Sequence, residues 1–359
     1  MPTGILRPAV TGPLRCAGLA AALLLVGCVT QPPADLAIDI PGDVTDARGR
    51  FGEIYCTVLD RRGESLPDYR PCSEALSQVV GTPRGDGRPV DLGYSQLRLV
   101  IGLVGGIGYG CIADWLAPPE SSRDHLRALG YDLRTIEVDA LSGSTHNARQ
   151  IRDAIMAMPP AEGPPRLVLL GYSKGAPDIL EALAGFPEIH DRIAAVVSIA
   201  GAVGGSPTAD HASEFQADLL SRLPGADCDK GDDEAVASLH TDVRRNWLAE
   251  HPLPRGLRYY SVVTLPERDN ISWVLGPSYD KISEVDPRND GQVIYRDQII
   301  PGSTLLAFVN ADHWAVVLPI DSSHPVIAAT LVNRNAFPRD ALLEAVLRFV
   351  EEDLSRPPP

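Results

Sequence analysis

Positive charge, aromatic residues and long apolar runs are all scarce in this sequence of 359 residues. Aromatic residues make up 6%, and 32 Lys and Arg stand against 47 Asp and Glu, a formal net charge of -15. Because nucleic-acid binding depends on Lys and Arg displacing counterions from phosphates, this balance argues against a nucleic-acid partner. The remaining composition, 44% hydrophobic and 22% charged, is that of a folded chain and excludes bulk disorder. Its length suits one large α/β domain with insertions.

The apolar run near the N-terminus is too short to cross a bilayer. A basic start precedes CAGLAAALLLVG, well under the roughly 20 residues that a spanning helix needs, so residues 1–27 are predicted to be a signal peptide. The run ends in LVGC, which resembles the lipobox of bacterial lipoproteins. This resemblance implies a mature chain that begins at a diacylated Cys28, followed by a tether over residues 28–37. The protein would then be held on the membrane of the bacterial envelope by its acyl chains.

Four further cysteines remain in the predicted mature chain: Cys56, Cys72, Cys111 and Cys228. An even number in an exported protein favours disulfides, and three pairings are possible. We expect Cys56 with Cys72, which flank a short hairpin-like segment, and Cys111 with Cys228. A zinc site is the alternative, but the sequence has no CxxC motif and no His at ligand spacing beside these cysteines.

From residue 97 onward, apolar runs alternate with helical patterns, which predicts βαβ units and a mostly parallel sheet. The expected strands are residues 97–104, 131–139, 166–170, 194–200, 257–265 and 304–310. The expected helices are residues 121–129, 144–158, 174–186 and 341–354.

Two segments interrupt this alternation. Residues 38–95 contain a strand-like FGEIYCTVL and are expected to add strands at the edge of the sheet. Residues 204–255 carry two patterns of apolar residues three and four positions apart, one from Phe215 to Leu223 and one from Val236 to Trp247. This second segment is predicted to be a helical cap.

A GxSxG motif is formed by Gly171, Tyr172, Ser173, Lys174 and Gly175. The pattern is weak by itself, but it lies between a predicted strand and a helix that starts at once. A serine hydroxyl is a poor nucleophile, and a sharp turn of this kind holds it clear of the sheet beside a base. We therefore predict that Ser173 is a nucleophile, with the Lys174 side chain in solvent.

His313 is the expected base, because it follows the last strand at the carboxyl edge of the sheet. The other histidines weighed for this role lie past the next apolar run or on the wrong side of the strand order: His324, His125, His146 and His190.

The acid should lie between serine and histidine in the chain order Ser, acid, His. Asp290, in the turn sequence RNDGQV, is the expected residue. The alternatives on the same long connection are Asp286, Asp280 and Asp269. Its role would be to hold the imidazole tautomer and to stabilise the imidazolium.

A developing oxyanion also needs donors. The N–H of Lys174, at a helix N-terminus, is one candidate, and the N–H of Ile107, after Gly105 and Gly106, is the other. No His precedes these glycines, so the HGGG form is absent. A dinucleotide loop is the alternative interpretation of GGIGYG, but its glycines do not have the GxGxxG spacing.

Taken together, GYSKG, NDGQV, ADHW and the strand order resemble the α/β-hydrolase superfamily, in its serine esterase and lipase branch. The resemblance covers residues 97–354, within an expected domain over residues 96–354, and implies an eight-stranded type of mostly parallel sheet. It also implies a Ser-His-Asp triad, a small-molecule or lipid ester as substrate, and no metal or organic cofactor. Acyl transfer, thioester hydrolysis and a non-catalytic scaffold remain alternatives on the same fold.

The cap is expected to roof Ser173, since it follows the strand next to the one that carries the serine. A bridge between Cys111 and Cys228 would then fasten this roof to the rim of the site.

Overall fold

The computed structural model describes residues 37–109, 120–159, 163–164, 166–211, 231–319 and 336–356. Within these ranges, seven strands form one all-parallel sheet in the order β1-β7-β6-β5-β4-β2-β3. The strands are β1 (Thr45–Asp46), β2 (Val100–Val104), β3 (Asp132–Thr135), β4 (Leu167–Tyr172), β5 (Ile193–Ile199), β6 (Arg258–Thr264) and β7 (Thr304–Val309). All six strands expected from the sequence are present, and the α/β architecture is confirmed.

The α-helices are α1 (Arg48–Arg62), α2 (Cys72–Ala75), α4 (Glu120–Ala128), α5 (Ser144–Ala157), α6 (Gly175–Gly185), α7 (Pro207–Asp210), α9 (Thr241–Glu250), α10 (Gly276–Ser283) and α13 (Arg339–Leu354). Short 3-10 helices are η1 (Gly63–Ser65), η2 (Pro187–Arg192), η3 (Ala237–Leu239), η4 (Arg268–Asn270), η5 (Trp273–Leu275) and η6 (Tyr295–Gln298). Among the described helices, none combines the length and the apolar character needed to cross a membrane.

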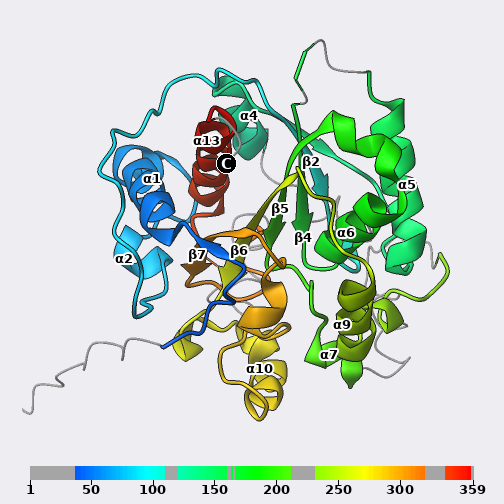
Figure 1. Ribbon diagram of the computed structural model, residues 1–359. Helices are drawn as coiled ribbons and strands as arrows, with labels where there is room; N and C mark the ends of the chain where they lie inside the picture. The colour runs from blue at the N-terminus through cyan, green and yellow to red at the C-terminus, as the bar shows by residue number, and fades with distance from the viewer. Residues whose placement is uncertain are drawn as a thin grey trace, which may run out of the picture. The chain divides into compact units, whose positions relative to one another are not determined.

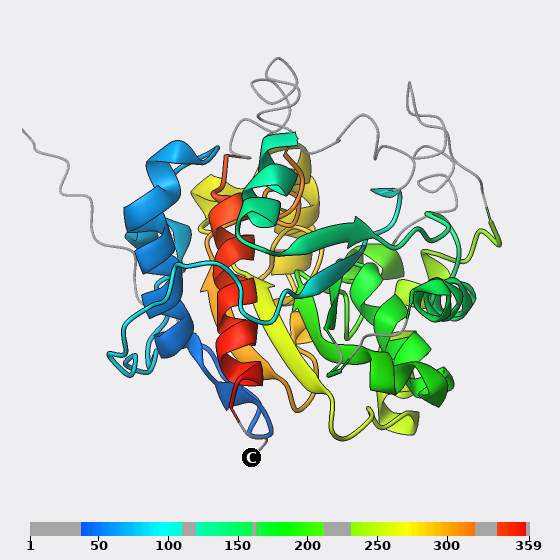
Figure 2. The same cartoon turned by 90° about the horizontal axis from the view of Figure 1, so that it is seen from above.

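Helices cover both faces of the sheet, with α1 and α13 on one side and α5 and α6 on the other (Figures 1 and 2). Alternate residues of β4 supply the two cores: Val168 and Leu170 pack toward α1 and α13, and Leu167 and Leu169 pack toward α5 and α6. Such a doubly covered parallel strand is apolar on both faces, which is why its sequence is a continuous hydrophobic run.

The N-terminal segment differs from the expectation. FGEIYCTVL lies in helix α1, so its interpretation as a strand was wrong. Phe51, Tyr55 and Val58 are spaced three and four residues apart and form one buried face, with the Phe51 ring 6.3 Å from that of Phe349 on α13. The aromatic and β-branched residues favoured a strand locally, but packing against α13 decides the structure. The segment adds only the two-residue strand β1 to the sheet.

The Cys56–Cys72 disulfide is confirmed, but it joins α1 to α2 rather than two strands of a hairpin. The chain after α2 lies along the carboxyl end of β7: Leu76 forms an antiparallel bridge with Val309, and the Ser77 N–H donates to the Phe308 carbonyl oxygen at 3.0 Å. The disulfide therefore links α1 to residues 76–77, which lie beside the loop that carries His313. These two residues are called the strap below. Cys28, Cys111 and Cys228 lie outside the described residues.

The insertion over residues 204–255 is described in part. Its second pattern forms η3 and α9, and α9 packs on α6 through an ion pair of the buried Arg244 with Glu181 at 2.5 Å. Val243 is exposed, although the pattern had placed it on the apolar face. The first pattern, from Phe215 to Leu223, lies outside the described residues, as does Cys228.

Candidate active site

Ser173 lies on a tight turn between β4 and α6. Its φ of 53° falls in the left-handed region that non-glycine residues rarely adopt, and strain of this kind concentrates at functional turns. The two glycines of the motif make room for the turn. A Cβ at Gly171 would lie 2.6 Å from the backbone of Ala176, and one at Gly175 would lie 2.2 Å from the Val104 carbonyl oxygen. The local geometry therefore requires glycine at both motif positions.

His313 follows β7 and meets Ser173 at the carboxyl edge of the sheet. Its Nε2 lies 2.8 Å from Ser173 Oγ. The Tyr172 hydroxyl donates to the main-chain oxygen of His313 at 2.8 Å, and the two rings lie 5.4 Å apart. Ser173 and His313 are only 7% and 4% exposed, so the pair is shielded from bulk water.

Asp290 completes the line of hydrogen bonds. Its Oδ2 lies 2.8 Å from His313 Nδ1, and it also accepts hydrogen bonds from Thr264 Oγ1 at 2.5 Å and Gln298 Nε2 at 3.2 Å. Its Oδ1 accepts from the main-chain N–H groups of residues 292 and 293 at 2.9 and 2.7 Å. The carboxylate is fully buried, and these donors replace the water that it has lost.

The alternative acids have other partners. Asp286 binds Arg288, Asp280 binds Arg268, and Asp269 is exposed in η4. Sequence reasoning missed Thr264 and Gln298, and no motif marks either residue. The only signal available was that Thr264 ends the strand before the long connection.

Three of the other histidines weighed as the base are bonded away from Ser173. The contacts are His125 with Glu344 at 2.7 Å, His146 with Asp139 at 2.9 Å and His190 with the Leu183 carbonyl oxygen at 2.7 Å. His324 lies outside the described residues.

Two main-chain N–H groups near Ser173 have no hydrogen-bond partner among the described residues. The loop after β2 passes beside the serine, since a Cβ at Gly106 would lie 2.8 Å from Ser173 Cβ. Within the described ranges, neither the N–H of Ile107 on that loop nor the N–H of Lys174 donates a hydrogen bond. The N-terminus of α6 also favours negative charge there. The two expected donors thus lie on the segments that flank Ser173.

The Lys174 side chain is buried, so the expectation that it is solvated was wrong. Its Nζ lies 2.8 and 2.9 Å from the two carboxylate oxygens of Asp178, one turn later on α6, and both side chains are 1% exposed. Asn147 on α5 donates to the same carboxylate at 2.8 Å. A buried charge needs a partner of this kind, and the sequence spacing of four residues was the available signal.

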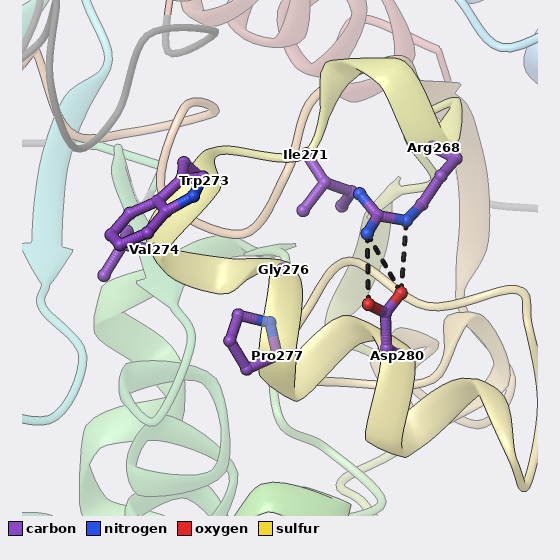
Figure 3. A pocket seen from close by; sticks show the side chains of 7 residues that line it. All are labelled: Arg268, Ile271, Trp273, Val274, Gly276, Pro277 and Asp280. Carbon is purple, nitrogen blue, oxygen red and sulfur yellow. Dashed lines mark hydrogen bonds and ion pairs between the residues drawn. The ribbon is translucent and has the colours of Figure 1, made fainter.

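A largely apolar hollow of about 580 Å³ lies on the connection between β6 and β7, the same connection that carries Asp290. It is lined by Ile271, Trp273, Val274, Gly276 and Pro277, with the Arg268–Asp280 ion pair on the side opposite Trp273 (Figure 3). Trp273 is 68% exposed, an unusual position for so large an apolar side chain.

Two hydrogen bonds attach the wall of this hollow to the candidate site. The Ser272 N–H donates to Asp312 Oδ2 at 2.8 Å, next to His313, and the Ser278 hydroxyl donates to the Gly291 carbonyl oxygen at 2.6 Å, next to Asp290. Sequence reasoning treated this connection only as the source of the acid.

Asp210, His240 and Asp242 bring possible metal-ligand atoms within 4.8 Å of one another where α7 meets α9. Asp210 already accepts hydrogen bonds from the N–H and the hydroxyl of Thr241, both at 2.8 Å. These bonds fix the start of α9, which accounts for Asp210 without a metal.

The sequence matches no protein-family model. It also matches no curated protein.

Solved structures do match. A carboxyl esterase of metagenomic origin is 37% identical, with a TM-score of 0.80 over 88% of this chain and 96% of that one. The mature lipase BlEst2 of Bacillus licheniformis is 21% identical, with a TM-score of 0.50 over 68% of this chain and 95% of that one. EstA from Clostridium botulinum is 12% identical, with a TM-score of 0.53 over 86% and 99%. The last two share the fold, whereas the first is close enough in sequence to show the family: the chain belongs to the α/β-hydrolase superfamily, in its serine esterase and lipase branch.

Proposed function

We propose that this protein hydrolyses carboxylic esters through Ser173, His313 and Asp290. One observation carries the proposal: the three side chains form an unbroken line, with 2.8 Å from Ser173 Oγ to His313 Nε2 and 2.8 Å from His313 Nδ1 to Asp290 Oδ2. Nucleophile, base and orienting acid in this arrangement are the requirement of acyl transfer to serine. The 37% identical relative is described as a carboxyl esterase, which supports the same reaction.

In the first half of the reaction, Ser173 Oγ attacks the ester carbonyl carbon while His313 Nε2 takes the hydroxyl proton. The carbonyl oxygen becomes an oxyanion, which the N–H groups of Lys174 and Ile107 would bind. Asp290 stabilises the imidazolium. When the tetrahedral intermediate collapses, the bond to the alcohol oxygen breaks, and His313 returns its proton to that alcohol.

In the second half, a water molecule replaces the alcohol. The water oxygen attacks the acyl carbon while His313 takes a proton from the water. The bond to Ser173 Oγ then breaks, the proton passes back to the serine, and a carboxylic acid leaves.

The hollow beside Trp273 supports an ester with an apolar chain as the substrate. Its volume of about 580 Å³ is within the usual range for small-molecule sites, and its lining is mainly apolar. An apolar chain placed there would be held by burial against Ile271, Trp273 and Pro277.

We also propose that the protein is a lipoprotein of the bacterial envelope, anchored at Cys28. The LVGC sequence at the end of the apolar run supports this location. A Cys28→Ala variant should lose lipid incorporation and leave the membrane fraction. Lipid incorporation that survives this substitution would contradict the anchor without touching the hydrolase.

Hydrolysis of p-nitrophenyl butyrate by the full chain tests the enzymatic proposal. Ser173→Ala should lower kcat by at least about 1000-fold with the fold intact by circular dichroism. Ser198→Ala is the matched control, because Ser198 is also buried and its hydroxyl has no partner among the described residues. Equal activity of the Ser173→Ala variant and this control would contradict the proposal.

A further inference from the structure

We propose that a buried polar chain joins the two main-chain donors of the oxyanion site, and that Asp178 and Asn147 in this chain are positioning residues for hydrolysis. The inference rests on the proposed function, because it assigns a task to groups that surround the same serine.

The chain begins at the donor after the nucleophile. Lys174 offers its N–H beside Ser173, while its side chain turns back into the protein and ends on Asp178, with Nζ 2.8 and 2.9 Å from the two carboxylate oxygens. The residue is therefore fixed at both ends: by the strained turn at Ser173 and by a bidentate ion pair in which each side chain is 1% exposed. A shift of the Lys174 main chain would move the base of this side chain and strain the pair.

The chain then crosses from α6 to α5. Asn147 Nδ2 donates to Asp178 Oδ2 at 2.8 Å and also to the main-chain oxygen of Asp139 at 3.2 Å. Asn147 is itself buried, and its side-chain oxygen has no hydrogen-bond partner among the described residues. A buried amide whose oxygen has no partner lowers the stability of the fold. Stability therefore does not explain why Asn147 is here, whereas its hydrogen bonds to Asp178 and Asp139 give it a positioning role.

The last step returns to the second donor. Asp139 is followed by Ala140, whose carbonyl oxygen accepts a hydrogen bond from the Gly108 N–H at 3.0 Å. Gly108 follows Ile107 directly, so this bond fixes the peptide next to the second candidate donor. One connected set of contacts thus runs from Lys174 through Asp178, Asn147 and residues 139–140 to the loop of Ile107.

Burying an ion pair is an inefficient way to stabilise a fold, because apolar residues of similar volume often do as well or better. Holding two donors at a fixed separation is a different task, since catalysis is sensitive to misplacement of about 1 Å. Glu181 lies on the same helix as Asp178, one turn beyond it, and forms a second ion pair, with the buried Arg244 of α9. The other contacts of this pair are with Val203, Thr145 and the Trp247 ring, and the charge of Arg244 also acts on Asp178. A change at Glu181 therefore alters the charge beside Asp178 but leaves its contacts with Lys174 and Asn147 in place, which makes it a matched control.

The experiment compares Asn147→Leu and Asp178→Asn with Glu181→Gln in the full chain. For each variant, kcat and KM are measured with p-nitrophenyl butyrate, together with the inhibition constant of a trifluoromethyl ketone, which forms a tetrahedral adduct bearing an oxyanion. Thermal unfolding is recorded in parallel. We expect the first two variants to lose about 10- to 100-fold in kcat with KM within a factor of about two, and to bind the ketone more weakly by the same factor. Glu181→Gln should lower the unfolding temperature but retain kcat.

Three results would overturn the inference: unchanged kcat in Asn147→Leu and Asp178→Asn, a loss of kcat equal to that of the control, or a loss of kcat with unchanged ketone binding. If Asp178→Asn fails to fold, the double variant Lys174→Met/Asp178→Leu removes both charges, and Asn147→Leu still decides the question. Wild-type protein without any hydrolysis overturns the proposed function as well, whereas active wild type with unaffected variants overturns the positioning role alone.

Discussion

Asp290 and His313 are joined twice. Asp290 Oδ2 lies 2.8 Å from His313 Nδ1, and the main-chain N–H of His313 donates to the main-chain oxygen of Asp290 at 3.0 Å. The side-chain contact orients the imidazole, and the main-chain contact sets the separation of the two loops that carry the residues. The position of the histidine therefore depends on the packing of the whole connection between β6 and β7.

Thr264 is predicted to support Asp290 in this role. Thr264→Val keeps the volume of the side chain but removes the hydroxyl that donates to Asp290 Oδ2 at 2.5 Å. A hydrogen bond to a charged group contributes about 1.5 to 3 kcal/mol, and loss of the lower value in the transition state would reduce kcat by about 10-fold. The control is Ser261→Ala on the same strand as Thr264, which loses hydroxyl contacts with Ser303 and the Ile300 N–H and should leave kcat unchanged. Equal rates for both variants would contradict this role.

The Cys56–Cys72 disulfide should stabilise the chain and its strap on β7. It closes a loop with a sequence separation of 16, and a closure of that size contributes about 3 kcal/mol to the free energy of unfolding. The double variant Cys56→Ser/Cys72→Ser should lose about this amount in a urea titration without reductant. Because the strap lies beside the loop of His313, activity should also be lost at a lower temperature. An unchanged urea midpoint would contradict the prediction.

Much of the fold follows from local pattern. Leu167 to Leu170 form a continuous apolar run because β4 is covered on both faces, and such a run predicts a central parallel strand. GYSKG marks the turn because Gly171 and Gly175 leave no room for a Cβ. The position of His313 after the last expected strand predicted it as the base, and the turn sequence RNDGQV predicted Asp290 as the acid.

The errors share one cause, which is contact between distant segments. The helix α1 was mistaken for a strand because its partner, Phe349 on α13, lies far along the chain. The ion pair of Lys174 with Asp178 depends on burial beneath α5, which the spacing of the two residues does not reveal. Gln298 reaches Asp290 through the tertiary fold alone.

Glu344 is predicted to make the free energy of unfolding depend on pH in the acid range. Burial raises the pKa of Glu344, but hydrogen bonds from His125 and Arg348 lower it more, so the pKa lies below its ordinary value of 4.5. A carboxyl group with a lowered pKa in the folded state adds stability above about pH 4.5, and this stability is lost as the pH falls through the folded pKa. Glu344→Gln should therefore lower the free energy of unfolding at pH 7 by about 3 kcal/mol.

The difference between wild type and Glu344→Gln should shrink as the pH falls below 4.5. Urea titrations of both proteins at a series of pH values measure it. A difference that stays constant from neutral to acid pH would show that the carboxylate charge has no part in the effect.

Trp273 is predicted to bind the apolar chain of the ester. Trp273→Ala removes one side of the hollow, so KM for p-nitrophenyl octanoate should rise by about five-fold, while KM for the acetate should not change. Val285→Ala is the matched control, because Val285 is exposed on the same connection but does not line the hollow. An equal rise for both esters, or the same rise in the control, would remove the hollow from the substrate site.

Covalent labelling of Ser173 tests the central claim most directly. The full chain is treated with a fluorophosphonate, digested, and the modified peptide is located by mass spectrometry, with Ser173→Ala and His313→Ala in parallel. A serine activated by the contact of 2.8 Å with His313 should carry the phosphonate in the wild type, react far more slowly in His313→Ala, and show no label in Ser173→Ala. Label on another residue, or unchanged labelling of the Ser173→Ala variant, would contradict the account.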